Sequence, residues 1–161
     1  MAAQTRMVKA NGLDMQIVEE GKGPLVLLCH GWPELSYSWR HQIPAIAAAG
    51  YRVVAPDMRG YGGTTAPKEI SAYTIFDLVG DVVTLVHALG EKEAIMVGHD
   101  WGAEVAWRAA MFRPDVFPAV AALSVPLRNR GPAAPMEILK QQGISTFYWQ
   151  YFQKPGVVEE E

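Results

Sequence analysis

The stretch Val97-Gly98-His99-Asp100-Trp101-Gly102 decides the fold that we predict for this chain. Apolar residues 94–97 indicate a short buried strand before it, and the apolar spacing of residues 105–112 indicates a helix after it. A strand that turns sharply into a helix strains its apex residue and needs small neighbours two positions away. Gly98 and Gly102 meet that need, so the pattern predicts a nucleophile elbow with Asp100 at its apex.

Predicted strands and helices alternate on both sides of this elbow. Asn11-Gly12 lies between two alternating runs and predicts an N-terminal antiparallel hairpin. Strands are expected at 25–29, 52–56 and 119–123, one helix from near Ser38 to Gly50, and another over 75–89 with Thr74 as its N-cap. This order favours right-handed βαβ units and an α/β fold with a mostly parallel, doubly wound sheet.

The composition of the chain changes near residue 126. Proline and glycine interrupt the pattern from Pro126 onward, and an aromatic-rich run follows at 147–152. We therefore predict a core domain over residues 1–126 and the beginning of a second, helical domain over 127–161.

Charge and composition narrow the classes of function. Half of the 161 residues are hydrophobic and 19% are charged, as in a globular domain. A net charge of −3 with scattered basic residues predicts binding neither to nucleic acid nor to an anionic membrane. The N-terminus lacks the apolar stretch of a signal peptide and the lone Cys29 cannot form an intrachain disulfide, so we expect a cytoplasmic protein. No phosphate loop or Cys/His cluster indicates a cofactor or a metal.

A carboxylate at the apex restricts the chemistry. Serine attacking an alkyl carbon would leave an ether, whereas Asp100 would leave an ester that water can hydrolyse. The pattern therefore indicates a substrate with an electrophilic sp³ carbon, an epoxide or an alkyl halide. The alternative, that Asp100 is a helix N-cap, explains the aspartate but not both glycines.

His30-Gly31-Trp32-Pro33 follows the strand at 25–29, where this architecture carries a second oxyanion donor. The backbone N–H groups of Trp32 and Trp101 are predicted to face the Asp100 carboxyl group. We expect the Trp32–Pro33 peptide bond to be trans, although a cis bond would also suit a fixed turn. An ordinary turn is the alternative.

With these residues in view, the chain resembles the epoxide hydrolases of the α/β-hydrolase family. The resemblance implies that Asp100 attacks the epoxide carbon, that the N–H groups of Trp32 and Trp101 form the oxyanion hole, and that residues 127–161 begin a helical cap. It also implies that Tyr148 donates a hydrogen bond to the epoxide oxygen, with Tyr151 as the alternative donor. The matching segments are 30–34, 38–40, 57–62, 97–102 and 151–156.

A small apolar epoxide is the expected substrate. The residues expected to line its cleft, besides the oxyanion donors, are His30, Pro33, Phe147, Trp149 and Tyr151. Packing in the core is the alternative for the aromatic side chains.

No histidine follows Asp100 in the sequence. Hydrolysis of the ester calls for a histidine base and a carboxylate partner, in the order nucleophile, acid, histidine. We therefore expect a fragment that lacks this pair and the last core strands, and that forms the ester once. The uncovered sheet edge predicts a complementing C-terminal chain or a homodimer.

Two rival classes of function remain, that of the dehalogenases and that of a non-catalytic protein. A haloalkane dehalogenase would usually have Asn or Glu in place of Trp32, and a fluoroacetate-type dehalogenase would have Arg in place of Trp101. A non-catalytic α/β-hydrolase scaffold or binding protein would explain the missing histidine without truncation.

Overall fold

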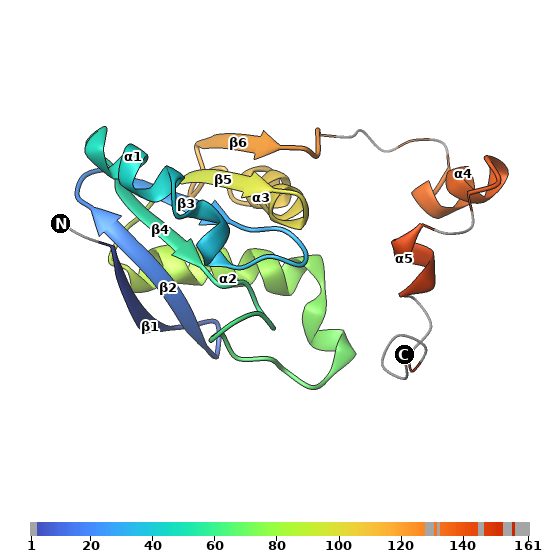
Figure 1. Cartoon of the computed structure of the whole chain (residues 1–161), viewed down its shortest axis with the longest axis horizontal. Helices are drawn as coiled ribbons and strands as arrows, with labels where there is room; N and C mark the ends of the chain where they lie inside the picture. The colour runs from blue at the N-terminus through green and yellow to red at the C-terminus, as the bar shows by residue number, and fades with distance from the viewer. Residues whose placement is uncertain (1–2, 128–130, 132, 145–146, 153–155, 157–161) are drawn as a thin grey trace. The chain divides into compact units, whose positions relative to one another are not determined.

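The computed structural model describes residues 3–127, 131, 133–144, 147–152 and 156. The chain divides into two compact units, Met1–Leu127 and Arg128–Glu161. Figure 1 shows the elements of both units along the chain. The first unit contains the sheet and the elbow.

Among the described residues, one sheet of six strands has the order β1-β2-β4-β3-β5-β6 (Figure 1). The N-terminal pair β1 and β2 is antiparallel, and β2 also runs antiparallel to β4. The remaining pairs, β4 with β3, β3 with β5 and β5 with β6, are parallel. The mostly parallel sheet with an N-terminal hairpin is therefore confirmed. The strands are β1 (Gln4–Ala10), β2 (Leu13–Gly21), β3 (Leu25–Cys29), β4 (Arg52–Pro56), β5 (Ile95–His99) and β6 (Ala119–Leu123).

The hairpin turn is the one that its sequence predicts. Asn11 has φ 48° and Gly12 has φ 75°. A two-residue turn whose twist matches the flanking strands requires positive φ at both central residues. Asn-Gly satisfies this with little strain, since asparagine tolerates that region better than most residues.

Three α-helices and two 3₁₀ helices of the first unit surround the sheet in the described residues. They are η1 (Ser36–Trp39), α1 (Gln42–Ala48), η2 (Ile70–Tyr73), α2 (Ile75–Ala88) and α3 (Trp101–Phe112). Thr74 caps α2 in a reciprocal pair with Asp77, as predicted. The single helix expected from near Ser38 to Gly50 is wrong, because Pro44 lacks an N–H and fits only the first turn of a helix that starts at Gln42.

Two hydrophobic clusters cover the two faces of the sheet. In β3, Val26 and Leu28 belong to one cluster while Leu27 and Cys29 belong to the other, which explains the continuous apolar run. Trp39 of η1 and Ile43 of α1 pack on the first face. The second face is covered from α2 and α3, with Val79, Val82, Leu85, Val86, Val105, Ala106 and Ala109 in its cluster.

The second unit contains short helices. These are α4 (Pro135–Gln141) and α5 (Tyr148–Tyr151). None of the helices in the described ranges is long and apolar enough to cross a membrane.

A buried ion pair ties the segment after β4 to helix α2. Arg59 donates from Nε to Asp81 Oδ2 at 2.8 Å and from a terminal nitrogen to Asp81 Oδ1 at 2.5 Å. The two side chains are 5% and 1% exposed. Asn11 adds a third hydrogen bond, from Nδ2 to Asp81 Oδ1 at 2.8 Å. Three segments that are distant in sequence therefore meet at one carboxylate.

We predict that Asp81→Ala destabilises the fold by about 3–5 kcal/mol, because it leaves the Arg59 guanidinium buried and unpaired. Urea unfolding followed by circular dichroism measures this loss. Asp115→Ala is the matched control, since Asp115 pairs with Arg113 at the surface and should shift the unfolding midpoint far less. Equal losses in the two variants would contradict the prediction.

Candidate active site

Asp100 lies at a strained turn between β5 and α3. Its φ of 52° and ψ of −118° place it among the few non-glycine residues of the described chain with positive φ. Within the described residues its side chain makes no capping hydrogen bond to α3, so the N-cap alternative is wrong. The elbow predicted from the sequence is confirmed.

The two flanking glycines are required by backbone contacts. A Cβ added to Gly98 would overlap the carbonyl oxygen of Gly102, and one added to Gly102 would overlap the carbonyl oxygen of Cys29. Gly98 therefore lets β5 turn into α3, and Gly102 lets α3 approach the end of β3. The pattern Gly-x-Asp-x-Gly thus has a steric cause at both glycines.

The loop of residues 31–35, which we call the oxyanion loop, follows β3 and brings a backbone donor to Asp100. Trp32 donates its N–H to Asp100 Oδ1 at 3.0 Å. A Cβ at Gly31 would lie 2.5 Å from Asp100 Cβ and 2.8 Å from Oδ1, so a side chain there would prevent this approach. The predicted contact between the Trp32 N–H and the carboxyl group of Asp100 is therefore present.

The Trp32–Pro33 peptide bond is cis, so the expectation of a trans bond is wrong. Glu34 donates its N–H to the Gly31 carbonyl oxygen at 3.0 Å, which closes a four-residue turn with Pro33 in third place. A turn with proline at this position takes the cis form, because a trans bond would open it. The oxyanion loop is therefore tightly folded.

Trp101 is the first residue of α3 and follows Asp100 directly. N–H groups in the first turn of a helix point along its axis toward the capping residue. The roles of the Trp32 and Trp101 N–H groups as oxyanion donors stay predictions. Trp101 and Trp32 are each 41% exposed, so both side chains are accessible beside Asp100.

His30 is buried beneath the oxyanion loop and supports it. Its Nε2 accepts the Met58 N–H at 2.9 Å, so Nδ1 carries the proton and donates to the Gly31 carbonyl oxygen at 2.8 Å. Burial lowers the pKa of this imidazole, against the opposing effects of Asp57 and Glu34. His30 is 1% exposed, which gives it a supporting role in place of the expected one of lining a cleft. Pro33 is exposed.

Glu34 connects the oxyanion loop to the strand that carries the nucleophile. Its Oε2 accepts the Gly31 N–H at 3.2 Å and lies 3.2 Å from His99 Nδ1. Sequence reasoning missed this bridge, although Glu34 ends one matching segment and His99 lies in another. Proximity of the two segments in space was the missing signal.

Ser124 is a second residue that sequence reasoning missed. It has φ 65°, and its Oγ accepts the Asp100 N–H at 3.3 Å, as does the Leu123 carbonyl oxygen. The end of β6 therefore holds the backbone of Asp100. A serine after a short strand carries no sequence signal for such a role.

The aromatic residues expected at the site from the second unit lie in and next to α5. Ring centroids of Phe147 lie 4.9 Å from Tyr148 and 5.3 Å from Trp149, and Tyr151 lies 5.9 Å from Phe152. These contacts form an aromatic cluster within the unit. The roles of Phe147, Tyr148, Trp149 and Tyr151 beside Asp100 stay predictions.

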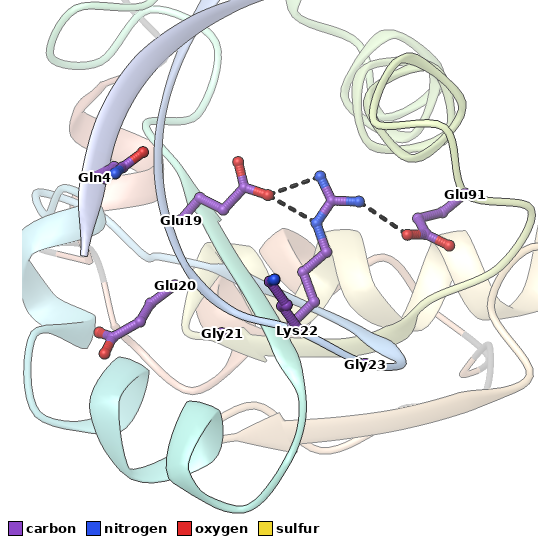
Figure 2. Close-up of a pocket in the computed structure, with 8 residues that line it drawn as sticks. Gln4, Glu19, Glu20, Gly21, Lys22, Gly23 and Glu91 are labelled. Atoms are coloured by element: carbon purple, nitrogen blue, oxygen red, sulfur yellow. Dashed lines mark hydrogen bonds and ion pairs between the residues drawn. The ribbon is translucent and has the colours of Figure 1, made fainter. Parts of the chain in front are cut away.

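A separate hollow of about 440 Å³ lies at the end of the sheet opposite to Asp100. Figure 2 shows residues that line it. Arg52, at the start of β4, is paired there with Glu19 and Glu91. Ligands of parallel α/β sheets bind beyond the carboxyl ends of the strands, whereas this hollow is at the amino end of β4. We therefore assign the chemistry to Asp100. The hollow is lined by Gln4, Glu19, Glu20, Gly21, Lys22, Gly23, Arg52 and Glu91.

The lowered pKa of His30 predicts a loss of stability in mild acid. Below the ordinary imidazole pKa of about 6.5, His30 of the unfolded chain binds a proton that folded His30 does not, so acid stabilises the unfolded state relative to the folded one. The slope approaches at most about 1.4 kcal/mol per pH unit from this group. His30→Gln keeps an acceptor for the Met58 N–H without titrating. Urea unfolding between pH 5 and 7.5 should show a shallower loss in this variant, and parallel curves would refute the prediction.

Comparisons with known proteins agree with this geometry. The alpha/beta hydrolase fold family matches residues 24–153. Epoxide hydrolase A of Mycobacterium tuberculosis is 49% identical over 165 residues, which cover 100% of this chain and 51% of that protein. Bifunctional epoxide hydrolase 2 of Sus scrofa is 48% identical over 151 residues, which cover 93% of this chain and 27% of that protein.

Solved structures give the same result. The crystal structure of an epoxide hydrolase from Vigna radiata matches with a TM-score of 0.92 and 48% identity, over 98% of this chain and 52% of that one. Epoxide hydrolase A from Mycobacterium thermoresistibile matches with a TM-score of 0.92 and 49% identity, over 97% of this chain and 50% of that one. The chain thus spans about half the length of several relatives that it matches, and less of the bifunctional one. By its family match, its sheet and its elbow, this chain belongs to the α/β-hydrolase family.

Proposed function

We propose that this chain carries the ester-forming half of an epoxide hydrolase, with Asp100 as the nucleophile. The observation that carries the proposal is the Asp100 carboxylate at the apex of the elbow with the Trp32 N–H on its Oδ1. A carboxylate that attacks an electrophilic sp³ carbon leaves an ester that water can hydrolyse. The relatives named epoxide hydrolase, at 44–49% identity, favour an epoxide over an alkyl halide.

The proposed step forms one bond and breaks one. Oδ1 is held by the Trp32 N–H, so Oδ2 attacks a ring carbon of the epoxide while the bond from that carbon to the ring oxygen breaks. The ring oxygen takes a proton, and the product is a hydroxyalkyl ester of Asp100. The proposed proton donor is the Tyr148 phenol, with Tyr151 as the alternative, because a phenol can accompany the charge that develops on the leaving oxygen.

The backbone donors act again when water attacks the ester. The carbonyl oxygen then becomes an oxyanion, and N–H groups fixed in advance stabilise it more than they stabilise the ester. The proposed pair is Trp32 and Trp101. The exposed side chains of the same two residues favour a small apolar epoxide.

Hydrolysis of the ester needs a base that we do not assign within these 161 residues. All four histidines precede Asp100. Both ring nitrogens of His30 take part in hydrogen bonds, and His99 faces Glu34. His41 lies just before helix α1, His87 lies on helix α2, and both are exposed. We therefore propose that this chain by itself forms the ester once.

The edge of β6 is the place where we propose a complementing chain or a second copy. In the described part of the chain, β6 pairs with β5 on one side, and Leu123 at its end is 45% exposed. An open edge with apolar side chains pairs readily with another strand.

Intact-mass measurement tests the nucleophile. The wild-type chain, incubated with a small aryl or alkyl epoxide, should gain the mass of one epoxide, and peptide mapping should place it on Asp100. Asp100→Asn should give no adduct, because an amide of the same shape keeps an acceptor for Trp32 but is a poor nucleophile. Asp115→Asn, at the surface, should react like the wild type.

Every other outcome contradicts part of the proposal. A folded wild-type chain without any adduct would favour a non-catalytic scaffold. An adduct from an alkyl halide but none from an epoxide would favour a dehalogenase. Repeated turnover of epoxide by the purified chain would refute the single-turnover proposal.

Gly31→Ala should slow ester formation by about 100-fold, because the added methyl group would overlap Asp100 Cβ and Oδ1 and displace the carboxylate from its attacking position. The rate of adduct formation by intact mass measures this. Gly131→Ala is the control, since its methyl group would meet one backbone oxygen at 3.8 Å, an ordinary contact. Unchanged ester formation in Gly31→Ala would mean that close approach of the loop is not needed.

A further inference from the structure

We infer that Asp57 is a positioning residue, whose buried carboxylate holds the oxyanion loop where the Trp32 N–H meets Asp100. Asp57 opens the segment Asp57-Met58-Arg59-Gly60-Tyr61-Gly62, to which the proposed function gives no role. The expected effect on ester formation rests on the proposed function. The expected effect on the loop does not.

The carboxylate of Asp57 is buried and held by N–H donors. Asp57 directly follows β4 and is 1% exposed. Its Oδ1 accepts the Ser36 N–H at 2.9 Å, and its Oδ2 accepts Gln16 Nε2 at 2.8 Å and the Gly63 N–H at 3.2 Å. In the part of the chain that the structure describes, no ion pair joins Asp57 to a cation, since Arg59 is paired with Asp81. A buried carboxylate in this state depends on its hydrogen bonds.

Residues 57 and 58 together hold both ends of the oxyanion loop. Ser36, bound by Asp57, directly follows the loop, and His30, bound by the Met58 N–H, directly precedes it. Between these ends, the Glu34 N–H to Gly31 carbonyl bond closes the loop on itself. With both ends fixed, the direction of the Trp32 N–H is determined by the residues after β4.

Two glycines make room for this arrangement. A Cβ at Gly62 would overlap the Asp57 carboxylate, and one at Gly63 would overlap the side-chain amide of Gln16. Gly62 also has φ 52°, which few other residues adopt without strain. Glycines that clear space for this carboxylate and for the Gln16 amide bound to it indicate that the segment is built around Asp57, in addition to its link with α2 through Arg59.

Ser36→Pro is the sharpest test, because it removes the single N–H by which Asp57 reaches the end of the loop. Ser36 is the first residue of η1, and Leu35 before it is extended with φ −137° and ψ 173°, so proline suits the backbone. Gln16 and Gly63 still satisfy Oδ2 in this variant. Ser36→Ala is the matched control, since it removes the hydroxyl group and keeps the N–H.

The first readout is the rate of adduct formation with an epoxide, measured on chains shown to be folded. Ser36→Pro and Asp57→Ala should react about tenfold more slowly or worse, because a displaced loop no longer orients the Asp100 carboxylate, and a misplacement of about 1 Å costs ~100-fold. Ser36→Ala should stay within about twofold of wild type. Asp81→Ala also loses a buried carboxylate but contacts no loop residue, so its folded fraction should react at the wild-type rate.

The second readout is independent of epoxide chemistry. In nuclear magnetic resonance spectra, the Trp32 amide proton of the wild type should shift when Asp100 is replaced in Asp100→Asn, because the two residues share a hydrogen bond. This shift should be lost when Asp100→Asn is combined with Ser36→Pro or Asp57→Ala, and kept when it is combined with Asp81→Ala. The Ser36 amide of the wild type should also exchange slowly with solvent.

The outcomes separate this inference from the proposed function. A wild-type chain that forms no adduct contradicts the proposed function, and the amide signals then decide the role of Asp57. Fast exchange of the Ser36 amide in the wild type would overturn the inference without any variant. So would a Trp32 signal that still responds to Asp100→Asn in Ser36→Pro, or equal slowing of ester formation by Asp57→Ala and Asp81→Ala.

Discussion

The hydrogen bond from the Trp32 N–H to Asp100 Oδ1 is the interaction on which the candidate site depends. It joins the ends of β3 and β5, which are adjacent and parallel in the sheet. Carboxyl ends of neighbouring parallel strands lie at one edge, so residues 68 positions apart meet without long side chains. The glycines at 31, 98 and 102 are there because backbone must approach backbone for this bond to form.

The sequence predicted the elbow because its signal is local. A buried strand, two glycines around an aspartate and a periodic helix occupy fewer than twenty consecutive residues, and each has a steric or hydrophobic cause. The same holds for the hairpin at Asn11-Gly12 and for the capped helix α2. These features of the fold and of the site were therefore predictable from residues that are neighbours in the chain.

Other parts of the site were not predictable because they depend on contacts between distant segments. The His99 contact with Glu34 spans 65 positions, and the hydrogen bond from the Ser36 N–H to Asp57 spans 21. The cis bond before Pro33 accompanies a turn closed between Gly31 and Glu34, and residues 36–48 divide into η1 and α1. These polar residues can be read in the sequence, but which of them contact one another is determined by the fold.

Backbone donors suit this site better than cations would. The proposed function needs a reactive carboxylate at Asp100, and a nearby guanidinium would stabilise its charge and weaken it as a nucleophile. Asp57 and Asp100 accept side-chain hydrogen bonds from backbone N–H groups and from the amide of Gln16. The guanidinium of Arg59, two residues beyond Asp57, is instead neutralised by Asp81. The arrangement therefore fixes the loop through neutral dipoles and leaves the charge on Asp100 available for the attack that we propose.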